Sequence, residues 1–158
     1  MRRLIITHLL TIVFCTQGQN LDRLDSIELG NIKGKHAFID SKKKLTAVIF
    51  LGTDCPISQK YMNRIEELNK KYKSGASFFG VVPMQFSIDE IREFKKEYKS
   101  SLVFVRDPGM ELASYLDAKV TPEVFLFEGT ELKYHGAIDN WFYELGKYRR
   151  NVTEQYLI

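Results

Sequence analysis

Apolar and polar positions alternate along the chain in blocks that favour strands followed by helices. Residues 47–51 form a short apolar run rich in β-branched and aromatic residues, which is typical of a buried strand. Pro56 follows closely and suits the first turn of a helix, where its missing N–H would be unpaired anyway. Apolar residues at spacings of three and four then predict an amphipathic helix that ends at about residue 72. These residues are Ile57, Tyr61, Ile65, Leu68 and Tyr72.

The middle of the chain repeats this alternation. Four further apolar runs predict strands at residues 77–82, 102–105, 124–127 and 132–135. Ser87 followed by Glu90 three positions later forms a capping box, which predicts the start of a second helix. A third, short helix is predicted to start at Asp107-Pro108.

The two ends of the domain carry less regular patterns. Alternating segments at 27–29 and 36–39 flank a glycine-bearing turn and predict an N-terminal hairpin. Near the other end, apolar residues at helical spacing predict a last helix, and they are Trp141, Phe142, Leu145 and Tyr148. Residues 153–158 look like the first turn of one more helix.

Strands that alternate with helices imply an α/β fold with a mainly parallel central sheet and helices on both faces. The strand pair within 124–135 adds an antiparallel edge, so the sheet is expected to be mixed. A length of 158 residues indicates one domain, and 44% hydrophobic with 27% charged residues is ordinary for a soluble globular protein.

The first 18 residues have the pattern of a secretory signal. Arg2 and Arg3 form the charged start, residues 4–15 the apolar core, and residues 16–18 a small-residue exit. The apolar run is short for a membrane span, so we expect no stable membrane insertion after signal removal. The short signal with Gly18-Gln19-Asn20 looks bacterial, and we expect export to the periplasm or outside the cell. The mature domain is then residues 19–158. A buried N-terminal element and lipid attachment at Cys15 are the alternatives, and bulky Phe14 disfavours the second.

Charge and cysteine content narrow the possible partners. The net charge is +3, and removal of the signal leaves 21 basic residues against 20 acidic ones, so no basic field attracts nucleic acid. Removal also takes Cys15, which leaves Cys55 as the one thiol of the mature chain, with no internal disulfide. An odd cysteine in an exported protein suggests a reactive thiol or pairing with another chain.

Cys55 lies where the predicted buried strand ends and the predicted helix begins, after Gly52 breaks the strand. Free N–H groups and the positive end of the helix dipole stabilise a thiolate there, so we expect its sulfur in the first helical turn, partly exposed and unbridged. Asp54 beside it opposes ionisation of the thiol, and Lys60, about one turn further on, offsets part of this effect. The residue pattern leaves the direction of the net pKa shift open.

Three segments together give the chain a resemblance to the thioredoxin-fold redoxins. They are residues 50–58 (FLGTDCPIS), 107–116 (DPGMELASYL) and 120–127 (VTPEVFLF). The chain is most similar to the branch related to alkyl hydroperoxide reductases and thiol-specific antioxidant proteins, and to the exported thiol–disulfide proteins near them. The resemblance covers roughly residues 25–150 and implies a thioredoxin-like fold, with a mixed central sheet flanked by helices and an N-terminal hairpin.

The resemblance also implies roles for particular residues. Cys55 is the implied nucleophile, and Pro122 is implied to follow a cis peptide bond and to lie against it. The backbone of Thr121 is implied to offer hydrogen bonds to an extended partner segment. A trans proline at a strand edge is the alternative interpretation. The residues implied to support the nucleophile are Thr53, Asp54, Pro56, Ser58, Thr121 and Pro122.

Two departures from the family pattern bear on the reaction. Dithiol members carry a second cysteine three positions after the first, where this chain has Ser58, so no local thiol releases a mixed disulfide. Peroxiredoxins carry a hydroxyl residue three positions before the cysteine and a proline seven before it, where this chain has Gly52 and Val48. Thr53 is the nearby alternative source of a hydroxyl.

No metal or other cofactor is expected. The copper-delivering branch of the family needs two cysteines and a histidine, whereas the mature chain has one cysteine. His36 and His135 are most simply surface or strand residues. Tyr61, Trp141 and Phe142 either line a groove near the reactive thiol or, more simply, are core and rim aromatics.

Two functions of different classes remain. The first is an exported thiol oxidoreductase or peroxiredoxin-like antioxidant in which Cys55 attacks a protein or small-molecule disulfide, or a peroxide, and an external thiol restores it. The second is a thioredoxin-fold binding module without catalytic turnover, which Ser58 favours. A lowered pKa of Cys55 discriminates between them, because a binding module has no need of a stabilised thiolate.

Overall fold

The computed structural model describes residues 27, 29–37, 39, 44–83, 86–144 and 146–157. The predicted signal at residues 1–18, with Cys15, lies outside the described residues. No helix within them is long and apolar enough to span a membrane.

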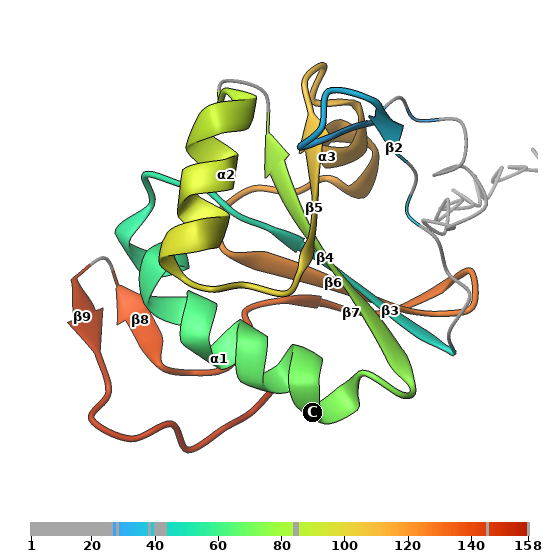
Figure 1. Ribbon diagram of the computed structural model, residues 1–158. Coiled ribbons are helices and arrows are strands. Elements are labelled where there is room, and N and C mark those ends of the chain that lie inside the picture. Colours follow the sequence, from blue (N-terminus) through green and yellow to red (C-terminus); the bar gives the residue numbers. More distant parts are fainter. Residues whose placement is uncertain are drawn as a thin grey trace, which may run out of the picture.

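A seven-stranded mixed sheet forms the centre of the protein, with strand order β2-β1-β5-β4-β3-β6-β7 (Figure 1). The strands are β1 (Leu29–Asn31), β2 (His36–Ala37), β3 (Leu45–Phe50), β4 (Ala76–Pro83), β5 (Val103–Asp107), β6 (Glu123–Glu128) and β7 (Glu131–Gly136). Only the β3–β4 and β4–β5 pairs are parallel, so the expectation of a mainly parallel sheet was wrong, while the mixed sheet and the β1–β2 hairpin are confirmed. The reason is that β6 returns beside β3 in the opposite direction, and β1 does the same beside β5.

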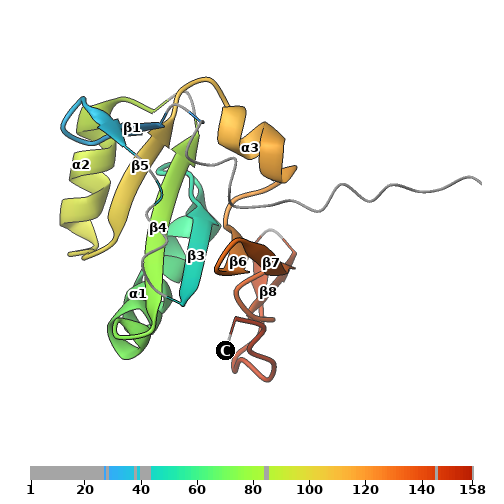
Figure 2. The same ribbon diagram turned by 90° about the vertical axis from the view of Figure 1, so that its right-hand side faces the viewer.

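Helices cover both faces of this sheet. They are α1 (Pro56–Tyr72), α2 (Ile88–Glu97) and α3 (Glu111–Leu116). α1 and α2 lie on one face and α3 on the other (Figure 2). Each face therefore has its own apolar layer, represented by Ile49 and Ile65 on one side and by Phe50, Leu112 and Phe125 on the other.

Local capping explains where the helices start. Ser87 Oγ accepts a hydrogen bond from the Glu90 N–H at 3.2 Å, and the Glu90 carboxylate accepts one from the Ser87 N–H at 2.6 Å, so the predicted capping box is confirmed. α3 begins at Glu111, later than predicted. Asp107 instead ends β5 and is fully buried, and its carboxylate accepts hydrogen bonds from backbone N–H groups in the first turn of α3.

The C-terminal part contains a hairpin where the sequence predicted a helix. β8 (Phe142–Glu144) pairs with β9 (Lys147–Tyr148) in antiparallel fashion. Gly146 has φ of 75°, which is a turn conformation that glycine adopts at no steric cost. Phe142 and Tyr148 then lie opposite each other with ring centroids 5.5 Å apart, and such cross-strand aromatic pairs stabilise strands. The turn of helix predicted at 153–158 is also wrong for the described part, since Gln155 bridges Asp139.

Candidate active site

The connection between β3 and α1 places Cys55 at the start of the helix. Cys55 is the N-cap residue of α1, in extended conformation, and Pro56 is the first helical residue, as predicted. The sulfur therefore lies just before the first turn rather than within it, but it still accepts a hydrogen bond from the Ser58 N–H at 3.5 Å. The thiol is free and partly exposed, which confirms the expectation of an unbridged cysteine.

Thr121 reaches Cys55 from the opposite side. The Thr121–Pro122 peptide bond is cis, as predicted. The Cys55 thiol donates a hydrogen bond to the Thr121 carbonyl oxygen, with 3.1 Å between sulfur and oxygen. The start of α1 and the segment before β6 thus meet at the sulfur.

The surroundings of the sulfur favour its thiolate form. Burial raises the pKa of Cys55, but hydrogen bonds from the Ser58 N–H and from the side chains of Thr121 and Ser58 outweigh it, and the net pKa is lowered. A reactive cysteine is expected to have a lowered pKa, and Cys55 has one.

Ser58 and Gly52 are joined by a hydrogen bond next to Cys55. Ser58 is fully buried, and its Oγ accepts a hydrogen bond from the Gly52 N–H at 3.3 Å. A Cβ atom at Gly52 would lie 3.1 Å from Cys55 Cβ and 3.3 Å from Thr121 Oγ1, so a hydroxyl residue at this position requires its neighbours to shift. The absence of a peroxiredoxin-like hydroxyl at position 52 thus coincides with a site that has little space for one.

Thr53 and Asp54, also assigned to the site by sequence, form the turn directly before Cys55. The Thr53 carbonyl oxygen accepts a hydrogen bond from Gln59 Nε2 at 2.8 Å, and Asp54 is exposed. Lys60 is the residue expected to offset Asp54. Its ammonium group lies over the Tyr148 ring, 4.6 Å from the centroid, and is thereby directed at the hairpin.

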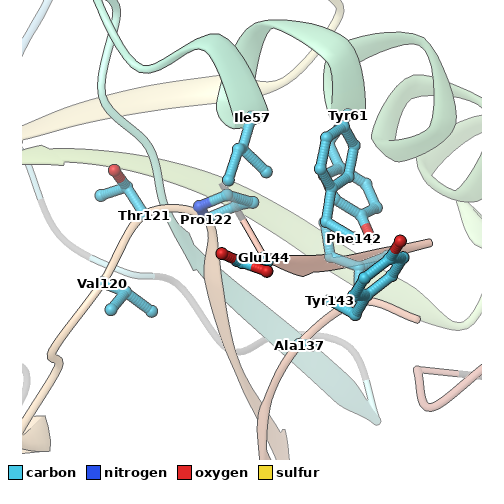
Figure 3. A pocket seen from close by; sticks show the side chains of 10 residues that line it. Ile57, Tyr61, Val120, Thr121, Pro122, Ala137, Phe142, Tyr143 and Glu144 are labelled. Atoms are coloured by element: carbon cyan, nitrogen blue, oxygen red, sulfur yellow. The ribbon is translucent and has the colours of Figure 1, made fainter. Parts of the chain in front are cut away.

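Two adjoining hollows flank this arrangement. The thiol hollow, of about 490 Å³, contains Cys55, and its other lining residues include Phe50, Pro83, Met110 and Lys119. The hairpin pocket, of about 260 Å³, is lined mainly by apolar residues (Figure 3). Its lining residues are Ile57, Tyr61, Val120, Thr121, Pro122, Ala137, Ile138, Phe142, Tyr143 and Glu144. Ile57, Val120 and Thr121 line both hollows and form the shared wall.

Sequence reasoning missed two parts of this site. It assigned only the backbone of Thr121 a role, whereas the Thr121 side chain also lowers the pKa of Cys55. It also missed Tyr143 and Glu144, because the predicted helix hid the hairpin that carries them. Tyr61, Trp141 and Phe142 belong to or pack against the core, as the simpler interpretation had it, and Tyr61 and Phe142 also line the hairpin pocket.

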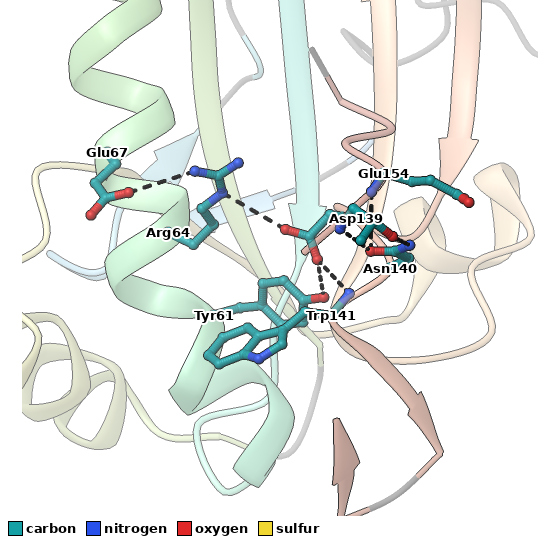
Figure 4. A network of polar contacts seen from close by, with 8 residues as sticks. Tyr61, Arg64, Glu67, Asp139, Asn140, Trp141 and Glu154 are labelled. Carbon is teal, nitrogen blue, oxygen red and sulfur yellow. Dashed lines mark hydrogen bonds and ion pairs between the residues drawn. The ribbon is translucent and has the colours of Figure 1, made fainter. Parts of the chain in front are cut away.

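A polar network holds the outer wall of the hairpin pocket (Figure 4). Asp139 is buried, and its Oδ1 accepts hydrogen bonds from the Tyr61 hydroxyl at 2.6 Å and from the Trp141 N–H at 2.9 Å. Asp139 Oδ2 lies 3.7 Å from Arg64 Nε, which makes an ion pair rather than a hydrogen bond. Burial and the Asp139 carboxylate both raise the pKa of Tyr61, so its phenol stays protonated and donates. The network ties the segment that leads into the hairpin to α1, the helix that Cys55 caps.

Metal ligation has no support among the described residues. They contain no group of three or more histidine, cysteine or acidic side chains that could hold a metal ion. His135 stacks on Phe125 at a centroid distance of 5.7 Å, as a strand residue of β7.

Comparisons with known proteins agree on the fold. No protein-family profile and no curated protein matches the sequence. An uncharacterized conserved protein from Geobacillus kaustophilus is similar in structure, with a TM-score of 0.68 and 20% identity over 79% of this chain and 69% of that one. A secreted Mycobacterium tuberculosis disulfide oxidoreductase homologous to E. coli DsbE matches with a TM-score of 0.62 and 12% identity, over 71% and 83% of the two chains. A thiol-disulfide oxidoreductase from Bacteroides fragilis matches with a TM-score of 0.61 and 18% identity, over 70% and 86%. The fold is therefore thioredoxin-like.

Proposed function

We propose that the protein is an exported thiol–disulfide oxidoreductase in which Cys55 is the single nucleophile. The observation that carries this proposal is the sulfur at the start of α1, partly exposed, with its pKa lowered by donors from Ser58 and Thr121. A thiolate in such a place attacks disulfides readily. Structural neighbours described as disulfide oxidoreductases, one of them secreted, support the same reaction class.

The exchange proceeds in two balanced steps. The Cys55 thiolate attacks one sulfur of a substrate disulfide, a Cys55–substrate disulfide forms, and the second substrate sulfur leaves as a thiolate. Ser58 stands where a dithiol protein would carry its second cysteine, so an external thiol must perform the second attack. That attack frees Cys55 and leaves a disulfide between the substrate and the external thiol.

The Thr121 backbone supports alignment of a polypeptide substrate. Among the described residues, none accepts a hydrogen bond from the Thr121 N–H, and its carbonyl oxygen accepts one from Cys55. Once Cys55 is in a disulfide it no longer donates, and both backbone groups of Thr121 are then free to pair with an extended chain.

Export follows from the proposed signal at residues 1–18, with residues 19–158 as the mature domain. Expression of the full chain in a bacterium, followed by fractionation and mass measurement of the product, tests it. We expect a periplasmic product that begins near residue 19, and a full-length cytoplasmic product contradicts export while leaving the thiol chemistry untouched.

Exchange kinetics test the thiol chemistry. The reduced protein is mixed with a disulfide of a peptide, and the Cys55–peptide adduct is followed by mass spectrometry, with Cys55→Ser as the control. We expect adduct formation faster than for a small-molecule thiol at the same pH, and multiple turnovers when an external thiol such as glutathione is added. Adducts that form no faster than with a small thiol argue against the proposal.

A binding module without turnover is the second candidate, and buried Ser58 at the position of the missing cysteine favours it. The same kinetics separate the two. A binding module captures a reduced partner peptide through the hollows whether or not residue 55 is a cysteine, whereas an oxidoreductase loses its capture of substrate in Cys55→Ser.

A further inference from the structure

We propose that the hairpin pocket receives an aromatic or branched aliphatic side chain of the substrate, two residues from the substrate cysteine, so that the protein selects polypeptide disulfides over small ones. The inference rests on the proposed thiol–disulfide exchange at Cys55 and adds a substrate class to it. The evidence comes from the lining of the hairpin pocket, to which β8 contributes Phe142, Tyr143 and Glu144.

Exposed apolar side chains mark the mouth of this pocket. Among the described residues, the large hydrophobic side chains that are exposed include Val120 at 63% and Tyr143 at 60%. Both line the hairpin pocket, one from the segment before β6 and the other from β8 (Figure 3). Exposed apolar groups gathered around a concave site are typical of contact surfaces for a partner.

The size of the pocket fits one side chain. Its volume of about 260 Å³ lies below the roughly 300–1,000 Å³ of sites that hold a whole small molecule. Glu144 at its rim forms an ion pair with Lys147 outside the apolar lining. With Ile57, Ile138 and Phe142 as further lining, the pocket fits an uncharged apolar group.

The position of the pocket sets the distance from the substrate cysteine. The thiol hollow and the hairpin pocket share Ile57, Val120 and Thr121 as a wall. In an extended chain, side chains two residues apart point the same way and are separated by about 7 Å. A substrate that crosses Thr121 with its cysteine at Cys55 therefore places the residue two positions away in the hairpin pocket.

Ring contacts and hydrogen bonds hold the Tyr61 and Phe142 side of the pocket in place, so this side is formed before a substrate arrives. The Tyr61 ring contacts those of Trp141 and Phe142, with centroid distances of 5.3 and 5.6 Å. Asp139 fixes both Tyr61 and Trp141 by hydrogen bonds (Figure 4). A preformed pocket gives selectivity at low entropic cost.

The reaction at the selected substrate is the exchange described above. The Cys55 thiolate forms a disulfide with the substrate cysteine that lies two residues from the apolar side chain, and the other substrate sulfur leaves as a thiolate. A small disulfide such as glutathione disulfide has no side chain to reach the hairpin pocket and gains nothing from it.

Paired substrates test this inference. Two short peptide disulfides differ only in phenylalanine or serine at the second position from the cysteine, placed before it in one series and after it in another. We expect the phenylalanine peptide to react roughly tenfold faster or more in one series, as for other apolar specificity pockets. Glutathione disulfide should react no faster than the serine peptide.

Matched variants localise the effect. Tyr143→Ser and Val120→Ser should reduce the phenylalanine-to-serine rate ratio to near one. Their controls are Tyr156→Ser and Val103→Ser, because these exposed residues, at 42% and 53%, do not line either hollow. Controls should keep the wild-type ratio. The ratio compares two substrates on one sample, so partial unfolding of a variant cancels.

The outcomes are separable. Rapid exchange at equal rates for the two peptides overturns the inference but leaves the proposed function standing. A preference for the phenylalanine peptide that persists in Tyr143→Ser has the same two consequences. If neither peptide nor glutathione disulfide reacts faster than with a small thiol, the proposed function fails and the inference with it.

Discussion

The Cys55 sulfur lies 3.1 Å from the carbonyl oxygen of Thr121, although the two residues are separated by 66 positions in the chain. This contact joins the start of α1 to the segment before β6. The Thr121 side chain adds a second interaction, which lowers the pKa of Cys55 together with Ser58. The properties of the thiol therefore depend on two distant segments.

The first prediction concerns the pH dependence of Cys55. Its pKa is lowered, and only the thiolate is nucleophilic, so the rate of alkylation by iodoacetamide should rise with pH through a midpoint below that of a free cysteine measured alongside. As pH falls through this midpoint the thiolate and the rate are lost together. Thr121→Val should move the midpoint upward. Thr53→Val, which removes a nearby hydroxyl that takes no part in lowering the pKa, should leave it in place.

The second prediction concerns the missing resolving thiol. Ser58→Cys places a thiol at the position whose N–H already donates to the Cys55 sulfur, so it can attack a mixed disulfide within the molecule. Turnover of insulin or glutathione disulfide should increase roughly tenfold or more, because an intramolecular thiol acts at a high effective concentration. Ser58→Ala is the control and should give no gain. An unchanged rate in Ser58→Cys shows that resolution does not limit turnover.

The third prediction concerns the oxidant. Peroxide cleavage needs donors placed around both peroxide oxygens, and Gly52 supplies no side chain for this purpose. Stopped-flow rates at matched pH should show hydrogen peroxide reacting with Cys55 at about the rate of a free thiolate, and disulfides reacting faster. A peroxide rate several orders of magnitude higher contradicts this and places the protein among the peroxidases.

The fourth prediction concerns the tie between Tyr61 and Asp139. Tyr61→Phe removes the 2.6 Å hydrogen bond and leaves a buried carboxylate with fewer donors. We expect the free energy of unfolding, measured in urea, to fall by about 1–3 kcal/mol. Tyr98→Phe is the control, because the Tyr98 hydroxyl makes no such bond to the described residues, and should change stability little. Equal effects of the two substitutions count against a specific role for Asp139.

The fifth prediction concerns buried Glu66, which connects α1 to the start of β5. Burial raises its pKa, but hydrogen bonds from Ser101 and the charge of Lys70 outweigh this and lower it. A lowered folded-state pKa stabilises the fold above the unfolded value of about 4.3, and this stability is lost as pH falls through the folded-state pKa. Glu66→Gln should therefore cost about 1–3 kcal/mol at pH ~7 and much less at pH ~2, measured by urea unfolding.

The control for this experiment is Glu93→Gln. Glu93 lies exposed on α2, so its substitution should leave stability within about 0.5 kcal/mol of wild type at both pH values. A Glu66→Gln cost that does not change with pH shows that the Glu66 charge is not what stabilises the contact.

Local chemistry made much of the fold predictable. Pro56 and the Ser87–Glu90 capping box determine helix starts through contacts within a few residues, so the sequence pattern was sufficient to place them. The helix predicted at 141–148 was wrong because contacts outside the segment determine its structure. Its apolar spacing suits a helix, but its aromatic residues pack on Tyr61, which is distant in sequence, and Asp139 accepts a hydrogen bond from the Trp141 N–H.

In the candidate site, too, features set by neighbouring residues were predictable and features set by distant segments were not. Cys55 stood out because its strand, proline and helix are adjacent in sequence. The hydroxyl of Thr121 and the pocket beneath Tyr143 depend on packing between distant segments, and no local pattern indicates such packing.

The positions of these segments along the chain also set the order in which the site is synthesised. A polypeptide is synthesised from its N-terminus, so Cys55 emerges well before Thr121 and long before Tyr143. A nascent chain that has left the ribosome only as far as β5 carries the thiol without the carbonyl, the hydroxyl or the apolar pocket that surround it in the finished fold. The full surroundings of Cys55 are thus present only after β8 has been synthesised.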